Sequence, residues 1–395
     1  MRWWYDNLEI TLQERITFTM AGIHIHIPFC KQACYYCDFH FSTSLKKKDE
    51  LILSLIKEIK LRKDELSGEV VETIYFGGGT PSMLSQQEID RIIQSVYDCH
   101  SVIDDPEITL EANPDDLSEE VIRELAESKV NRLSIGIQSF FERDLKLMNR
   151  AHNAVEAKKC LEFATQYFDN ISLDLIYGIP GLSNDEWQEN IQTALSFGIP
   201  HISSYALTVE PKTALESFIN KGIINEVDDE QAQEQFHILL EELQQADFVH
   251  YELSNFGKEG FFSKNNSAYW QGKYYLGIGP SAHSFDGNRR GWNVRNNSQY
   301  IKSLEQNKLP IERETLTKTD QYNEYIMTGL RTMWGVDLEK VKSDFGIKHY
   351  EYLLLHSEKH REEDLLYIDD TKLKTTQKGK FLSDGIAADL FKLNL

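Results

Sequence analysis

The sequence lacks a run of about 18 uncharged apolar residues, the minimum for a membrane-spanning helix. Its first 19 residues also lack the apolar core of a signal peptide. Basic residues are in deficit. The formal net charge is −21, so the surface repels phosphate, which excludes non-specific nucleic-acid binding. Cysteine is scarce, and three of the five thiols fall within residues 30–37. This odd, clustered set argues against a disulfide framework and for reduced, cytoplasmic thiols that are free to bind metal.

The composition present is that of a globular protein, and the 395 residues suffice for two domains. Residues 1–19 precede a second methionine, Met20, which stands directly before the first apolar run. We expect residues 1–19 to be a non-native or disordered N-terminal extension. The remaining chain is expected to divide into a first domain at 20–235 and a C-terminal domain at 236–395.

Short apolar runs alternate with helical patterns along the first domain. The runs are residues 23–27, 73–76, 108–112, 132–137, 171–177 and 201–207. The helical patterns are residues 50–62, 86–97, 118–127 and 154–167. Six strands alternating with helices predict parallel βα units, and hence an α/β fold with an incomplete (β/α)6 barrel of the TIM type. Residues 353–395 predict a C-terminal α+β domain that is winged-helix-like. In a barrel, functional groups gather at the C-terminal ends of the strands.

Three cysteines follow the first predicted strand directly, in the spacing CxxxCxxC: Cys30, Cys34 and Cys37. Thiolates are soft ligands that suit iron–sulfur clusters or zinc. This spacing can wrap three corners of a 4Fe–4S cubane and leave one iron open to a cofactor or substrate. A zinc site with His40 as fourth ligand is the alternative, which the crowding of four ligands into residues 30–40 disfavours.

Polar groups and glycines recur at the ends of the next strands. The glycines at 77–79 indicate close approach of the backbone to another group, or a tight turn. Glu111 needs a partner such as an ammonium group or ribose hydroxyls. Gln138 ends the fourth strand, and the guanidinium of Arg150 is shaped to hold a carboxylate. With Asp174 in the fifth strand as an acceptor for ribose, the set predicts a site for S-adenosylmethionine, although each residue alone could be merely solvated.

These motifs resemble those of the radical S-adenosylmethionine superfamily, within it the anaerobic coproporphyrinogen III oxidase-like group. The resemblance rests on HIPFC with CxxxCxxC, the GGGTP stretch, QSF at 138–140 and DLIYG at 174–178, and it covers nearly all of residues 20–395. The oxidases carry a fourth cysteine two positions after the third and a longer N-terminal region. Here that position is Phe39, and 29 residues precede Cys30. Both features are similar to the heme chaperone (HemW-type) subgroup.

The resemblance implies cluster ligation by the three cysteines. It also implies contacts to S-adenosylmethionine from ten positions: His24, Tyr36, Gly78, Gly79, Thr80, Glu111, Gln138, Arg150, Asp174 and Ala206. The implied cofactors are a 4Fe–4S cluster and S-adenosylmethionine, with heme as cargo. The implied partners are heme or another tetrapyrrole, an acceptor hemoprotein of respiration, and a reductant such as flavodoxin or ferredoxin.

Two departures from the family pattern concern ligand binding. The family has tyrosine where this chain has His24, which alters one cofactor contact. The chaperones also carry an HNxxYW motif, which here begins with Asn265, and an amide is a poor axial ligand for heme iron. His283 and His250 are possible substitutes, and each could equally be a hydrogen-bonded structural histidine.

The aromatic residues near the altered HNxxYW motif allow two interpretations. Tyr269, Trp270, Tyr274 and Tyr275 could line a flat apolar pocket or belong to the core. Two functional hypotheses follow. The chain is a heme chaperone, or it is a radical enzyme of the coproporphyrinogen dehydrogenase type, an oxidoreductase of porphyrin biosynthesis. The sequence leaves open whether the chain is an enzyme.

Overall fold

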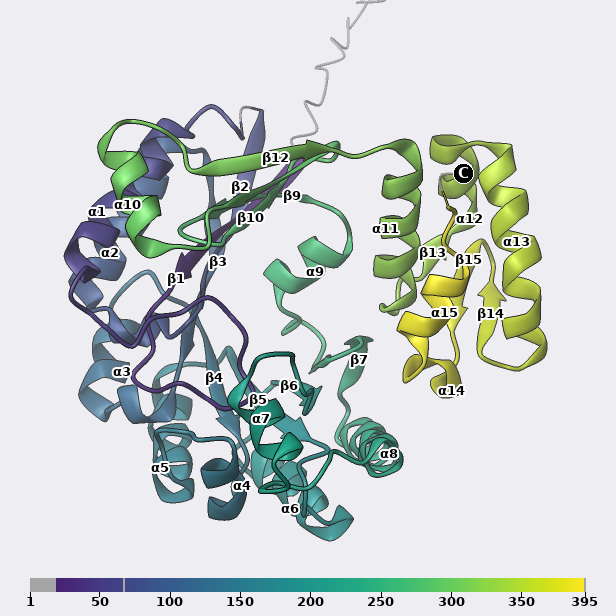
Figure 1. The fold of residues 1–395 in the computed structure, drawn as a ribbon, viewed down its shortest axis with the longest axis horizontal. Helices are drawn as coiled ribbons and strands as arrows, with labels where there is room; N and C mark the ends of the chain where they lie inside the picture. The colour runs from purple at the N-terminus through teal and green to yellow at the C-terminus, as the bar shows by residue number, and fades with distance from the viewer. Residues whose placement is uncertain (1–18, 67, 394–395) are drawn as a thin grey trace, which may run out of the picture.

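The computed structural model describes residues 19–66 and 68–393, which form two units, each around its own hydrophobic core (Figure 1). The larger unit contains a 12-stranded sheet and the smaller a 3-stranded sheet. Within the described ranges, no helix is long and apolar enough to cross a membrane. Of the extension expected at 1–19, all but Thr19 lies outside the described residues.

Six parallel strands form the centre of the large sheet in the order of the chain. They are β1 (Thr19–Ile27), β2 (Glu69–Gly78), β3 (Val102–Ala112), β4 (Arg132–Gln138), β5 (Ile171–Tyr177) and β6 (His201–Ala206). Each pairs in parallel with its successor, which confirms the predicted α/β partial barrel. The first three strands begin earlier than predicted, because backbone pairing continues through polar residues. β3, for example, runs through the exposed Asp104 and Asp105.

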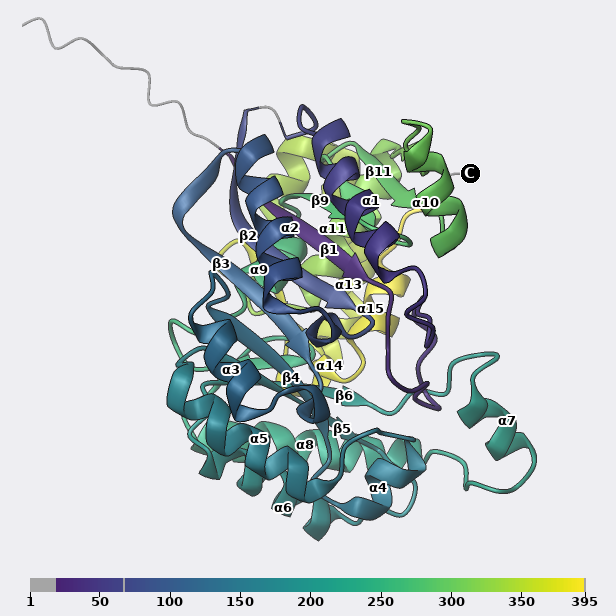
Figure 2. The same cartoon turned by 90° about the vertical axis from the view of Figure 1, so that its left-hand side faces the viewer.

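Helices follow these strands and, apart from the short helix at Ala214–Asn220 that projects to one side, cover the outer face of the sheet (Figure 2). They are α1 (Lys48–Leu61), α2 (Gln86–Cys99), α3 (Glu119–Ala126), α4 (Glu142–Leu147), α5 (Ala154–Tyr167), α6 (Asn184–Ser196), α7 (Ala214–Asn220) and α8 (Asp229–Gln245), with the short turns η1 (Pro81–Met83) and η2 (Pro114–Asp116). Three of these helices start with a capping box, at Ser85, Asn153 and Ser183. Each box satisfies free backbone N–H groups and so fixes where the helix begins.

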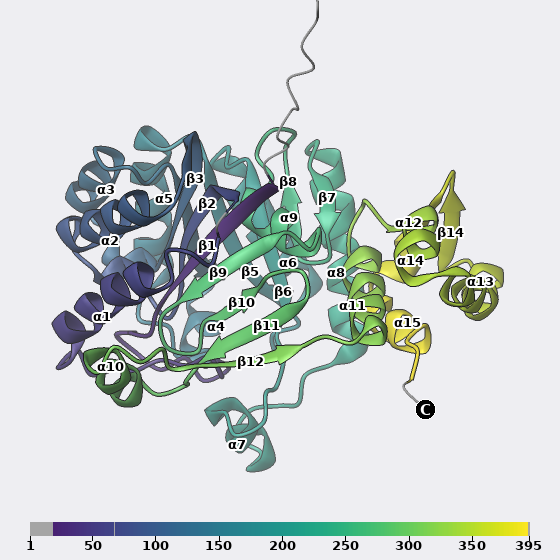
Figure 3. The same cartoon turned by 90° about the horizontal axis from the view of Figure 1, so that it is seen from above.

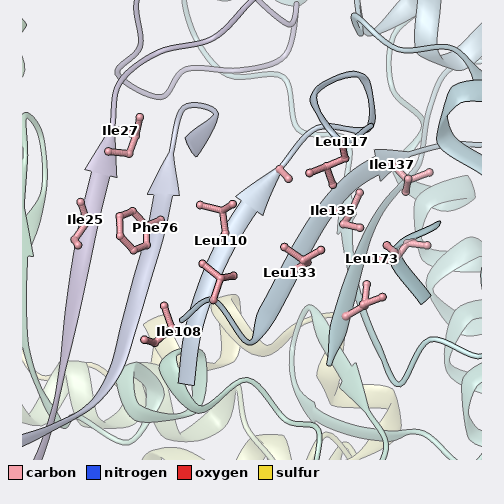
Figure 4. Packing of buried hydrophobic residues seen from close by; sticks show 14 of the residues in the cluster. Ile25, Ile27, Phe76, Ile108, Leu110, Leu117, Leu133, Ile135, Ile137 and Leu173 are labelled. Carbon is pink, nitrogen blue, oxygen red and sulfur yellow. The ribbon is translucent and has the colours of Figure 1, made fainter. Parts of the chain in front are cut away.

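Alternation of side chains along β1 separates the core from the interior of the barrel. Ile23, Ile25 and Ile27 are fully buried in the main core with residues of α1 and α2. The intervening His24 and His26 point to the opposite face, because successive strand residues alternate in direction. Figure 4 shows Ile25 and Ile27 beside apolar residues of the neighbouring strands. The barrel interior is therefore available for polar chemistry.

Residues after 235 extend this sheet at both edges (Figure 3). The added elements are β7 (Val249–Glu252), β8 (Asn255–Gly257), α9 (Lys264–Trp270), β9 (Tyr274–Ile278), β10 (His283–Phe285), β11 (Arg289–Asn293), α10 (Asn297–Glu305) and β12 (Ile311–Thr315). β9 pairs in parallel with β1, and β8 pairs antiparallel with β6. The division expected at residue 235 therefore falls within the larger unit, between its parallel strands and their extensions.

A buried ion pair joins α1 to the extension beside β1. Glu58 and Arg62 have fully buried side chains, and Arg62 Nη1 lies 2.9 Å from Glu58 Oε1. Arg62 also donates to the carbonyl of Gly277 at 2.7 Å. Glu58 accepts from the backbone of Gly279 at 2.9 Å and from the amide of Asn293 at 2.7 Å. This network satisfies both charges away from water, as buried ions require.

The smaller unit follows β12 and lies beside the sheet (Figure 1). Its elements are α11 (Lys318–Leu330), β13 (Val336–Asp337), α12 (Leu338–Lys340), the π-helical turn η3 (Val341–Phe345), α13 (Ile347–Glu362), β14 (Leu366–Asp369), β15 (Lys372–Thr375), α14 (Gln377–Lys380) and α15 (Ser383–Asp389). Its own core includes Tyr322, Leu353 and Leu373. This confirms the expected C-terminal α+β domain.

Candidate functional site

The loop between β1 and α1 carries the three clustered cysteines. All three are partly buried, and none of the five cysteines of the chain forms a disulfide. The backbone N–H of Cys30 donates to the carbonyl of Ser42 at 3.1 Å, and that of Tyr35 donates to Met148 at 3.1 Å. The loop is thus closed on itself at the start of the cysteine motif and fixed within the motif by a contact with the distant Met148.

Burial makes two of these thiols, Cys30 and Cys37, reluctant to ionise on their own. It raises the pKa of Cys30, and it raises the pKa of Cys37 to about 11. The guanidinium of Arg150 lies close by, with Nη1 3.4 Å from Cys34 Sγ. A soft metal centre offsets the cost of forming buried thiolates, because its positive charge replaces the lost hydration.

The alternative of a zinc site does not fit the positions of the side chains. His40 Nε2 lies 2.7 Å from Asn297 Oδ1, so the proposed fourth ligand is engaged elsewhere. Within residues 19–66 and 68–393, no three His, Cys, Asp or Glu side chains are arranged to hold one metal ion. A single zinc ion needs ligands that converge on one point. A cubane binds each thiolate to a different iron and has no such requirement.

Arg150 follows α4 and is tied to the protein more tightly than predicted. Its Nη2 donates to Asn113 Oδ1 at 2.6 Å and to the carbonyl of Gly136 at 2.8 Å. Its Nη1 lies 3.5 Å from the hydroxyl of Tyr36, another predicted cofactor residue. Of the guanidinium nitrogens of Arg150, Nε alone is buried and has no hydrogen-bond partner among the described residues. The guanidinium thus links the cysteine loop to Asn113 and Gly136, which the sequence did not indicate.

Two buried carboxylates face the interior of the barrel. Tyr75 donates its hydroxyl to Glu111 Oε1 at 2.7 Å, and the backbone N–H of Gly78 donates to Oε2 at 3.1 Å. Burial raises the pKa of Glu111 to about 7 and that of Asp174 to about 6. Neither forms an ion pair with another described residue. Both are therefore acceptors that a ligand with ammonium or hydroxyl donors would satisfy. Asp174 lies mid-strand in β5, inside the barrel, and not at the strand end where it was predicted.

The glycines at the end of β2 are required by the protein's own packing. Gly78 has φ +104°, and a Cβ there would overlap the ring of His26. A Cβ on Gly79 would come within 2.7 Å of the carbonyls of Ile27 and Phe29. The backbone N–H of Thr80 donates to that same Phe29 carbonyl at 2.6 Å. The predicted close approach is thus at least in part an approach to β1 itself.

Gln138 ends β4, as predicted, and Ala206 ends β6, one residue before the predicted end of that run. Gln138 is buried with φ +68°, a conformation rare outside glycine, where the pairing of β4 with β5 shifts register. A Cβ on Gly136 would come within 2.8 Å of the side-chain nitrogen of Gln138. Ala206 ends β6 opposite Tyr177. Strain at Gln138 marks the strand end as a position worth testing for ligand contact.

A cavity of about 770 Å³ opens beside these residues, within the size range of small-molecule sites. We call its β-strand side, with His24, His26, Gly78 and Glu111, the cofactor wall. The adjoining part of the lining, with Asn265 and Tyr269 of α9 and Tyr274 and Tyr275 of β9, which pairs with β1, is called the aromatic wall. The other lining residues include Phe39, His40, Lys273, His283, Arg290 and Arg295. Of the predicted cofactor residues, the cavity brings together His24, Gly78 and Glu111.

His250 and Trp270 lie outside this cavity. His250 stacks on Phe256 with ring centroids 4.2 Å apart, and its two ring nitrogens contact Lys380 Nζ at 2.8 Å and the carbonyl of Leu253 at 3.1 Å. It is a structural histidine that joins the two units. Trp270 lines a second cavity of about 700 Å³, which shares Tyr269, Tyr275 and Arg290 with the first.

Comparison with known proteins agrees with this geometry. Residues 24–194 match the Radical SAM superfamily and residues 316–382 match the HemN C-terminal domain. The heme chaperone HemW of Lactococcus lactis is 34% identical over 92% of this chain and 95% of that protein. HemW of Bacillus subtilis is 32% identical over 93% of this chain and 98% of that protein. The chain belongs to the HemW family.

A solved structure supports the fold of this HemW family member. Coproporphyrinogen III oxidase (HemN) from Escherichia coli, a radical SAM enzyme, superposes with a TM-score of 0.83. The match covers 95% of this chain and 91% of that one at 21% identity, which shows a shared fold. Membership of the Radical SAM superfamily implies a 4Fe–4S cluster and S-adenosylmethionine as cofactors. The residues fit both, since the loop offers three soft ligands and the barrel offers buried carboxylates that form no ion pair with a described residue.

Sequence reasoning missed several residues that shape the site. Tyr75 holds Glu111 and stacks on His24, with ring centroids 5.6 Å apart. Asn113 holds Arg150. A signal for both was present, because Tyr75 and Asn113 lie two residues from Gly77 and Glu111 and so share their face of the sheet. Arg295 lines the cavity from a loop, and no pattern in the sequence indicated this position.

Proposed function

We propose that this protein is a heme chaperone, which holds a 4Fe–4S cluster and S-adenosylmethionine and delivers heme to an acceptor hemoprotein. One observation carries the proposal. A single cavity has predicted cofactor residues on one wall and three tyrosines on the other. A small polar cofactor and a large flat ligand would therefore lie against each other. The HemW relatives, named as heme chaperones, support the same assignment.

On the cofactor side, Cys30, Cys34 and Cys37 would hold the cluster. When bound, a cluster with three protein ligands supplies an open iron, to which the amino and carboxylate groups of S-adenosylmethionine can coordinate, and a source of electrons. The chain's own residues prepare this place. Arg150 sets a fixed positive charge 3.4 Å from Cys34 Sγ. Glu111 offers its carboxylate to donors of the cofactor.

The other predicted cofactor residues surround this place on neighbouring elements. We propose that S-adenosylmethionine is also contacted by residues at the strand ends and in the cysteine loop: Tyr36, Gly78, Gly79, Thr80, Gln138, Arg150, Asp174 and Ala206. Asp174 lies mid-strand in β5, where its buried carboxylate can accept from ribose hydroxyls. Gly136, next to both Gln138 and Arg150, keeps room between them.

On the heme side, exposed aromatic and basic groups face the cavity. Tyr269 is 50% exposed, so its ring is available for stacking on a flat ligand. Arg295 donates to the backbone carbonyl of Asp38 and forms no ion pair with a described carboxylate, which leaves its charge available to a heme propionate. Phe39 is 68% exposed and lines the cavity where the oxidases carry a fourth cysteine. This replacement favours a carrier over the oxidase.

The proposal includes partners and a compartment. We expect an acceptor hemoprotein of respiration, a reductant such as flavodoxin or ferredoxin, and a cytoplasmic location. Five free thiols suit a reducing compartment, where cysteines stay available for metal. A surplus of acidic side chains leaves no role for nucleic acid.

Hemin titration of the full chain, with its cluster reconstituted anaerobically, tests the proposal. We expect binding at micromolar hemin, and stronger binding by Asn265→His, because that variant restores an imidazole to the aromatic wall. A parallel assay supplies coproporphyrinogen III, S-adenosylmethionine and a reductant. We expect no protoporphyrinogen IX. Its formation by the purified protein would establish the oxidase alternative, and failure of the wild type to bind hemin would refute the chaperone assignment.

A further inference from the structure

Four histidines line the cavity: His24, His26, His40 and His283. Two of them are engaged by the protein. His26 Nε2 lies 3.0 Å from the carbonyl of His40, and His40 Nε2 lies 2.7 Å from Asn297 Oδ1. Neither His24 nor His283 makes a hydrogen bond to any described residue. An exposed imidazole such as His283 can hydrogen-bond to water, whereas unpartnered ring nitrogens on the less exposed His24 that face a cavity point to a ligand.

His24 is held rigidly at the centre of the cofactor wall. β1 is paired on both sides, and in that register His24 stands opposite Tyr75 of β2 and Gly277 of β9. Its ring stacks on that of Tyr75 with an interplanar angle of 18°. A Cβ on Gly277 would overlap the carbonyl of His283, so the main chain of His283 occupies the neighbouring place on the same face. The two unpartnered imidazoles therefore lie beside each other.

The two imidazoles differ in burial. His283 is exposed, whereas His24 is partly buried among other side chains. Burial, with the neighbouring His26 and His283, lowers the pKa of His24 to about 3. A neutral imidazole with an open nitrogen is the form that binds metal. His24 thus combines a fixed ring, a free nitrogen and a cavity wide enough for a flat ligand.

We propose that His24 supplies the axial ligand to the iron of the bound heme. This inference rests on the proposed heme-chaperone function, and it gives His24 a role different from the S-adenosylmethionine contact that the family resemblance implies. Asn265, which also lines the cavity, accepts from Thr73 at 3.3 Å and offers only an amide. The ligand is thereby placed on the rigid strand β1 and not on the short helix α9. The heme would lie against the cofactor wall and the aromatic wall.

Hemin titration of the anaerobically reconstituted full chain tests this assignment. Electron paramagnetic resonance and resonance Raman spectra of the ferric heme report the axial ligand independently of cluster absorption. We expect an imidazole signature in the wild type. In His24→Gln the signature should be lost, and hemin affinity should fall by about tenfold or more. The matched control His283→Gln, from the neighbouring imidazole, should keep both the signature and the affinity.

Iron and sulfide contents and circular dichroism show whether each variant is folded and loaded. His24→Gly adds a second test, because free imidazole should restore the signature in a vacated site. Retention of the signature in His24→Gln, or its loss in His283→Gln alone, would overturn the assignment and leave the chaperone function intact. A wild type that does not bind hemin at micromolar concentration would instead refute the proposed function itself.

Discussion

The two walls of the cavity are built in different ways. The cofactor wall comes from the adjacent parallel strands β1, β2 and β3, and its side chains are held by neighbours, as Tyr75 holds Glu111. The aromatic wall comes from the short helix α9 and from β9, and Tyr269 is half exposed. A wall built from paired strands holds its side chains in fixed positions, which suits a small cofactor. An exposed aromatic wall suits a large flat ligand that must enter and leave.

Loss of one thiol should abolish the function of the cofactor wall. We expect Cys34→Ser to lose its cluster, since a cubane needs its thiolates, with iron and sulfide falling from about four each per chain toward zero. Cys99→Ser is the matched control, because Cys99 ends α2 and lies outside the loop. Hemin binding should survive in both variants. If Cys34→Ser lost hemin binding and kept its cluster, the distinction between the walls would fail.

Replacement of the buried carboxylate should weaken cofactor binding without loss of the cluster. We expect Glu111→Gln to bind S-adenosylmethionine about 10- to 100-fold more weakly at pH 8, because a hydrogen bond to a charged group contributes about 1.5–3 kcal/mol. Equilibrium dialysis or calorimetry measures this. The control is Glu186→Gln, a carboxylate paired with Arg143 on the outer surface.

The affinity for S-adenosylmethionine should depend on pH, and the pKa of Glu111 predicts the direction of the change. The pKa of Glu111 is raised to about 7 by burial, so the carboxyl is mostly neutral at pH 6 and ionised at pH 8. Donors of the cofactor bind the ionised form, so affinity should rise from pH 6 to pH 8, by up to about tenfold per pH unit below the pKa. In Glu111→Gln the profile should be flat from pH 7 to pH 8, with a small rise left near pH 6 where Asp174 ionises. An equally steep profile in the variant would assign the titration to another group.

The smallest effect is expected at the rim of the aromatic wall. Arg295→Ala should weaken hemin binding about two- to fivefold, since exposed ion pairs contribute about 0.2–1 kcal/mol. Binding of S-adenosylmethionine should not change. Arg313→Ala is the control, as Arg313 pairs with Glu65 away from this cavity. If Arg295→Ala weakened the binding of S-adenosylmethionine instead, Arg295 would serve the cofactor and not heme.

The cofactor wall was predictable from sequence to a greater extent than the aromatic wall. Short apolar runs located β5 and its neighbours, and the CxxxCxxC loop follows β1 as predicted. The partner of Arg150 was not predictable, because Cys34 lies 116 residues away and the contact has no local pattern. The approach of α9 to β1 is likewise long-range, so the sequence left the tyrosines undecided between pocket and core.

The buried pair of Glu58 and Arg62 determines where the chain can be cut. A fragment that ended near residue 235 would keep both charges on α1 and lose Gly277, Gly279 and Asn293, which now satisfy them. Each buried group left without its hydrogen-bond partner costs about 1–3 kcal/mol, so the loss of three partners removes a large part of the stability of an ordinary domain. The barrel is therefore not a detachable module. Dissection of this protein should keep β9–β11 with the barrel and divide the chain after β12, where the second core begins.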